Sequence, residues 1–165
     1  MINDVMRTSF FTLAIAILGV ILGLYIGDLN NNEKSAFLAQ SGFTLERNSP
    51  SDWVAEDKIK IYKDKVVIEI PYPILAKFAN TNSMDPVIDE TANAIEIVPT
   101  SPEQIKPGDI ISYSTEIGNV VHRVVAIGYD DMGWYAITQG DNNSIPDRAK
   151  VRWDQVKRVV VAVIY

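Results

Sequence analysis

Two side chains in this sequence could together supply a nucleophile and a base. Ser83 lies in NTNSMDPVIDE (residues 80–90), a turn-like stretch between strand-like segments. A serine hydroxyl is a poor nucleophile near neutral pH unless a general base accepts its proton. His122, the one histidine of the chain, lies in the β-branched run VVHRVV, and a strand there would fix the direction of its imidazole. A lone strand histidine is more often structural, so the pair needs further support.

Two carboxylates follow His122 in the segment ITQGDNNSIPDR, at Asp141 and Asp147. A buried acid that accepts a hydrogen bond from the far ring nitrogen fixes the imidazole tautomer and stabilises the imidazolium. Either aspartate could do this, and the sequence does not decide between them. The alternative is a polar turn in which the Asp and Asn side chains bond their own backbone.

Four short boxes occur in a fixed order along the chain. They are SMDP (83–86), KPGDII (106–111), VVHRVVAI (120–127) and QGDNN (139–143), with Asp147 after the last. This order resembles the type I signal peptidase family. Within it the chain is similar to the archaeal and endoplasmic-reticulum branch, which has histidine where the bacterial branch has lysine. The resemblance runs from about residue 80 to the C-terminus.

The resemblance implies a membrane-bound serine endopeptidase that removes signal peptides from secreted preproteins. In that family Ser83 would be the nucleophile and His122 the general base. Asp147 matches the acidic third member, and Asp141 matches a second aspartate that supports the site. The backbone N–H of Ser83 would help to bind the tetrahedral oxyanion, with the hydroxyl of Thr81 as a second donor.

Alternating apolar and polar residues predict a mainly β domain over residues 56–165, in keeping with a small β-domain of the signal peptidase type. The expected strands lie at 58–70 (a hairpin with a Lys-Asp turn), 74–79, 94–99, 109–114, 119–129, 133–140 and 156–165. Many short strands at this spacing are typical of a sandwich or a small barrel.

The segment just before the nucleophile is the candidate substrate groove. Its apolar residues are Ile74, Leu75, Ala76 and Phe78. An extended substrate would add to an exposed sheet edge there. An ordinary core strand is the alternative interpretation.

The N-terminal region predicts a membrane anchor. Residues 8–27 carry no charge, and a helix of that length spans a hydrocarbon core of about 30 Å. We expect a short tail at 1–9, a transmembrane anchor at 10–27 and a polar linker at 28–55. A cleavable signal peptide is the rival interpretation, but no A-x-A-like site follows the apolar stretch.

Composition and charge exclude several classes of site. The chain has no cysteine, so disulfides, Cys-ligated zinc and thiol catalysis are ruled out. A single histidine rules out a multi-His metal site, no EF-hand spacing occurs, and we expect neither metal nor organic cofactor. A net charge of −6 argues against a nucleic-acid partner.

The resemblance implies preprotein substrates as partners, with the secretion translocon as a further candidate, and the apolar N-terminal segment implies the lipid bilayer. Lys and Arg are almost evenly divided across the expected anchor, and the free amino terminus favours N-inside. We expect a single-pass protein of the cell membrane with its catalytic domain on the extracytoplasmic face.

Two other functions stay open at this point. A self-cleaving repressor-like serine protease shares the S-M-x-P turn, but it uses a lysine base and is soluble. A catalytically inactive, membrane-anchored β-domain would instead bind a protein partner. The chain also departs from the signal peptidase pattern, because its anchor and nucleophile are unusually far apart and Asn82 stands where glycine is common.

Overall fold

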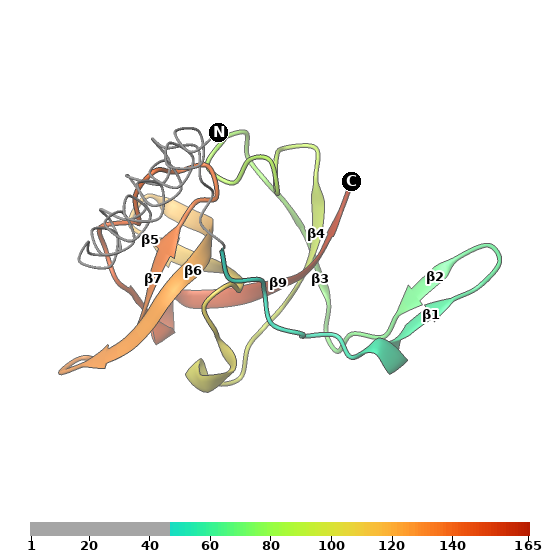
Figure 1. Cartoon of the computed structure of the whole chain (residues 1–165), viewed down its shortest axis with the longest axis horizontal. Helices are drawn as coiled ribbons and strands as arrows, with labels where there is room; N and C mark the ends of the chain where they lie inside the picture. The colour runs from blue at the N-terminus through green and yellow to red at the C-terminus, as the bar shows by residue number, and fades with distance from the viewer. Residues whose placement is uncertain (1–46) are drawn as a thin grey trace, which may run out of the picture. The chain divides into compact units, whose positions relative to one another are not determined.

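The chain folds as a mainly β protein, as its alternating pattern predicts (Figure 1). The computed structural model describes residues 47–165. Its strands are β1 (Ile59–Ile61), β2 (Val66–Ile68), β3 (Ile74–Lys77), β4 (Asn93–Ile97), β5 (Ile110–Thr115), β6 (Gly118–Asp130), β7 (Gly133–Gln139), β8 (Val151–Arg152) and β9 (Val156–Ile164). Three short 3₁₀ helices are η1 (Glu56–Lys58), η2 (Pro102–Gln104) and η3 (Trp153–Gln155).

Seven of these strands form one antiparallel sheet in the order β3-β4-β9-β5-β6-β7-β8. The last described strand, β9, lies between β4 and β5. The centre of the sheet therefore pairs segments that are far apart in the sequence. Strand β3 pairs only with β4 among the described residues. One edge of β3 is therefore free of a neighbouring strand.

The remaining two strands form a separate hairpin. Strands β1 and β2 turn at the expected Lys-Asp dipeptide, where the N–H of Tyr62 donates to the carbonyl of Lys65. Figure 1 shows this hairpin standing apart from the seven-stranded sheet. Its apolar side chains are exposed, so it contributes nothing to the cores described next.

Both faces of the sheet carry a hydrophobic core. On β5, Ile110 and Ile111 point into opposite cores, and on β9 the neighbours Val159 and Val160 do the same. The first core comprises Ile105, Ile111, Tyr113, Val124, Trp134, Ala136, Val151 and Val159. The second comprises Met84, Ile88, Ala92, Ala94, Ile110 and Val160. A strand buried on both faces needs apolar residues at consecutive positions, which explains the run VVVAVI in β9.

The central pairings are interrupted by register shifts. One lies between Ile95 and Glu96 on β4, and another lies between Ser112 and Tyr113 on β5, both against β9. A bulge inserts a residue, bends its strand and re-aims the side chains around it. Three polar residues flank these shifts. Glu96 and Ser112 line the groove that also contains Ser83 and His122, and Tyr113 bonds Asp147.

Residues 47–55 belong to the same compact unit as the sheet. The buried carboxylate of Asp109 accepts hydrogen bonds from Ser51 N at 2.7 Å and from Trp53 Nε1 at 3.1 Å. Gly108 has a φ of 107°, and a Cβ there would overlap the backbone oxygen of Ser49. The Gly-Asp pair of the KPGDII box thus holds the end of the expected linker to the sheet.

The expected tail at 1–9, the anchor at 10–27 and the linker as far as residue 46 lie outside the described residues. Within residues 47–165, no helix is long and apolar enough to cross a membrane.

Candidate active site

Ser83 lies in the loop between β3 and β4, in a turn that a buried methionine anchors. Asn82, directly before it, has a φ of 56°, a left-handed conformation that asparagine tolerates better than most residues other than glycine. Met84, directly after it, is only 4% exposed and belongs to the second core. The backbone on both sides of the serine is therefore fixed.

A second loop holds this turn from outside. The N–H of Asn142 donates to the carbonyl of Ser83 at 2.9 Å, and its side-chain amide donates to the carbonyl of Asn82, also at 2.9 Å. Gly140 approaches so closely that a Cβ there would overlap the carbonyl oxygen of Ser83. A backbone turn forms here, since Asn143 N donates to Gly140 O at 3.0 Å, but the side chains of Asp141 and Asn142 bond other segments and not the turn's own backbone. It also holds the serine turn in place.

His122 projects from β6 and is 8% exposed. Its Nδ1 lies 2.7 Å from Oδ2 of Asp147. A carboxylate can only accept, so Nδ1 carries a proton and Nε2 is the ring nitrogen left to act as a base. Among residues 47–165, Nε2 makes no hydrogen bond. Of the two candidate aspartates, Asp147 is therefore the one that contacts the imidazole.

Two further side chains converge on Asp147, and no motif in the sequence pointed to either. The hydroxyl of Tyr113 donates to Oδ2 at 3.0 Å, and Thr138 Oγ1 lies 2.7 Å from the same oxygen. Burial raises the pKa of Tyr113, and the neighbouring Asp147 carboxylate raises it further. The Tyr113 hydroxyl therefore stays protonated and remains a donor. The two hydroxyls and the imidazole fix Oδ2 of Asp147 in one position.

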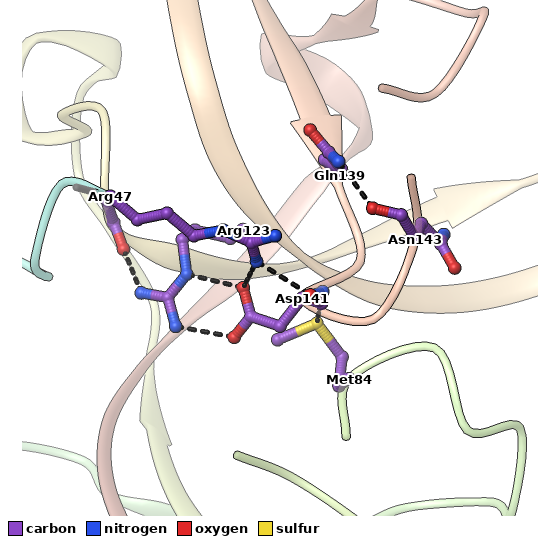
Figure 2. Close-up of polar contacts among 7 residues, drawn as sticks. Arg47, Met84, Arg123, Gln139, Asp141 and Asn143 are labelled. Carbon is purple, nitrogen blue, oxygen red and sulfur yellow. Dashed lines mark hydrogen bonds and ion pairs between the residues drawn. The ribbon is translucent and has the colours of Figure 1, made fainter. Parts of the chain in front are cut away.

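Asp141 makes different contacts, which Figure 2 shows. Its carboxylate forms a bidentate pair with Arg123, with Nε to Oδ1 at 2.7 Å and a terminal nitrogen to Oδ2 at 2.6 Å. Arg47 donates to the backbone carbonyl of Asp141 at 2.7 Å. The backbone N of Asp141 lies 3.4 Å from Sδ of Met84. Arg123 also donates to the carbonyl of Gly108 at 2.8 Å. Asp141 thus supports the loop against the serine turn and does not touch His122.

Ser83 and His122 line the same groove, whose volume is about 480 Å³. No hydrogen bond joins them in the described part of the chain. The hydroxyl of Ser83 instead lies 3.2 Å from Thr81 Oγ1. Catalytic hydrogen bonds often tighten only when substrate is bound. The backbone N–H of Ser83 has no partner within residues 47–165, so it is available to an oxyanion.

The four expected groove residues all line this same groove. Leu75 is 62% exposed, whereas Ala76 and Phe78 also pack against the second core. The core-strand interpretation therefore accounts for part of the segment, and the groove wall and the second core share residues.

This arrangement has the parts of an acyl-transfer site. It holds a hydroxyl on a rigid turn, an imidazole oriented by a carboxylate, and a free backbone donor beside the hydroxyl. Within residues 47–165, no three His, Asp or Glu side chains lie close enough to hold a metal ion.

Comparison of the chain with protein-family models, with curated proteins and with solved structures gave no match. The chemistry of the site is therefore inferred from the residues and their geometry.

Proposed function

We propose that this protein is a membrane-anchored serine endopeptidase that removes signal peptides from secreted preproteins, as its resemblance to the type I signal peptidases implies. The observation that carries the proposal is the 2.7 Å contact between His122 and Asp147 in a groove that Ser83 also lines. An oriented imidazole and a half-buried serine hydroxyl in one groove are the groups that acyl transfer needs.

The first half of the reaction forms an acyl-enzyme. Ser83 Oγ attacks the carbonyl carbon of the scissile peptide bond while Nε2 of His122 accepts its proton. Asp147 stabilises the imidazolium that forms. The Ser83 N–H, together with the Thr81 hydroxyl, donates to the oxyanion. When the C–N bond breaks, His122 returns the proton to the leaving amine.

The second half releases the signal peptide. A water molecule gives its proton to His122 and attacks the ester carbonyl. The ester C–O bond breaks, His122 protonates Ser83 Oγ, and the free carboxyl end of the signal peptide leaves. No metal or organic cofactor takes part in either half.

Substrate binding in this proposal uses the free edge of β3. An extended peptide can add to that edge through backbone hydrogen bonds and direct alternate side chains into the groove. The exposed Leu75 and half-buried Ile74 would contact its apolar side chains. The anchor expected at 10–27 would keep the domain on the extracytoplasmic face of the cell membrane, where preproteins emerge from the translocon.

A second candidate is a membrane-anchored β-domain that binds a protein segment without cleaving it. The lack of a hydrogen bond between Ser83 and His122 within the described chain favours this alternative. The free edge of β3 would serve binding equally well.

Cleavage of a model preprotein by the full chain in detergent separates the two candidates. We expect one cut at the signal-peptide junction, with N-terminal sequencing of the product as the readout. Ser83→Ala and His122→Ala should abolish the cut, and the exposed Ser144→Ala should not. An intact chain that binds the preprotein but leaves it uncut would favour the binding domain.

A further inference from the structure

The groove that contains Ser83 is lined by cations, although the chain carries a net charge of −6. Lys77 at the end of β3 and Arg158 on β9 both line it. Among the described residues that line it, Glu96 carries the only carboxylate. The local charge is thus opposite in sign to that of the whole molecule.

Glu96 is occupied by other residues of the protein. It is 2% exposed, and its carboxylate accepts a hydrogen bond from the hydroxyl of Ser112. Its other oxygen lies 3.7 Å from a guanidinium nitrogen of Arg158. Both Glu96 and Ser112 line the groove. A buried carboxylate with these partners serves to hold Arg158 and is closed to a substrate.

Arg158 is the group that remains open to a ligand. Its side chain is 38% exposed, and none of its N–H groups makes a hydrogen bond with a described residue. A guanidinium offers a planar fork of donors that matches a carboxylate in two-point geometry. Lys77, which forms no ion pair within residues 47–165, adds a second positive charge to the same groove.

We propose that this groove prefers an extended peptide segment that carries an acidic side chain, with Arg158 as its main recognition residue and Lys77 in support. The inference rests on the proposed function, because it names the substrate class of the same site. It goes beyond the proposal by assigning a charge preference to residues that take no part in the chemistry. A basic side chain close to Arg158 would be repelled by its guanidinium.

The test measures binding separately from cleavage. The full chain with Ser83→Ala, in detergent at low salt, is titrated with a fluorescent preprotein-derived peptide that carries one Glu and with its Gln twin. We expect about fivefold tighter binding of the Glu peptide, the scale of a partly exposed ion pair. Salt should reduce this ratio. Arg158→Gln should bring it close to one, and Arg158→Lys should retain part of it.

Arg148→Gln, an exposed arginine outside the groove, is the matched control and should keep the full ratio. Unchanged affinity of Arg158→Gln for the Gln peptide would show that the variant is folded. Equal affinity of the two peptides, or a preference that survives Arg158→Gln, would overturn the inference.

Cleavage then separates the two proposals. Wild-type chain that cuts both peptides with equal kcat/KM overturns the charge preference and leaves the peptidase standing. A Glu preference in binding, without cleavage, supports the groove assignment and overturns the peptidase. Binding of neither peptide overturns both.

Discussion

Asp141 and Asp147 belong to the same loop, yet their carboxylates serve different partners. Asp147 accepts hydrogen bonds around the His122 ring, whereas Asp141 forms a buried pair with Arg123. In the proposed reaction, the carboxylate that bonds the imidazole would orient the base. The carboxylate that pairs with a buried arginine stabilises the folded state. Substitutions at the two positions should therefore differ in kind.

Asp147→Asn should lower kcat by about 10³- to 10⁴-fold, because an amide favours the wrong imidazole tautomer, and it should leave the melting temperature nearly unchanged. Asp141→Asn should instead destabilise the fold by about 3 kcal/mol by leaving Arg123 buried without its counter-ion. Thermal unfolding and steady-state kinetics on both variants separate the effects. Equal losses of kcat at equal stability would contradict this division.

The hydroxyl of Tyr113 provides a finer test of the same site. Because burial raises the pKa of Tyr113, the hydroxyl donates to Asp147 throughout the neutral range. Tyr113→Phe should lower kcat by about tenfold, the scale of a hydrogen bond to a charged group, with KM unchanged. Tyr129→Phe, on the exposed part of β6, is the control. A rise in KM at constant kcat would mean that Tyr113 acts in binding and does not position the acid.

At the scale of elements, the sheet and the hairpin β1–β2 are independent. Within residues 47–165 the two strands of the hairpin pair only with each other. Its ends already meet, because Glu69 N donates to Lys58 O at 2.9 Å. Replacing residues 59–68 by a short Gly-Ser link should leave thermal unfolding of the domain within about 2 °C of the parent, since no core contact is lost. If the shortened variant no longer unfolds in a cooperative thermal transition, the hairpin does support the sheet.

The elements also show what the sequence could and could not predict. Period-two alternation located every strand longer than two residues, and only β8 was missed, because two residues carry no period. The position of β9 between β4 and β5 could not be predicted, because local sequence pattern does not determine which distant strands pair. The same limit hid Tyr113 and Thr138, which reach Asp147 from separate strands.

At the scale of the whole molecule, the candidate site joins the two cores. Met84, which follows Ser83, belongs to the second core, and Tyr113, which bonds Asp147, belongs to the first. The relative position of serine and imidazole therefore depends on how both cores pack across one sheet. The sequence left open whether Asp141 or Asp147 contacts His122, and the fold shows that Asp147 does. The dependence on two cores likewise follows only from the fold.

Stability of the whole domain should also depend on pH through Asp130. Hydrogen bonds from Arg152 and Lys150 hold the pKa of the Asp130 carboxyl well below its ordinary value. A depressed folded pKa contributes stability above the unfolded value, near about 3.9, and that stability is lost as pH falls through the folded value. Asp130→Asn should flatten the fall of the melting temperature below pH 4. Asp131→Asn, an exposed neighbour, should not.

The most direct test of the central claim is the kcat/KM for a model preprotein of the wild-type chain, of Ser83→Ala, of His122→Ala and of the double variant. If the two side chains act as one unit, each single substitution removes nearly all activity and the double variant is no worse than either. Losses that multiply, or a Ser83→Ala chain that still cuts, would contradict the account.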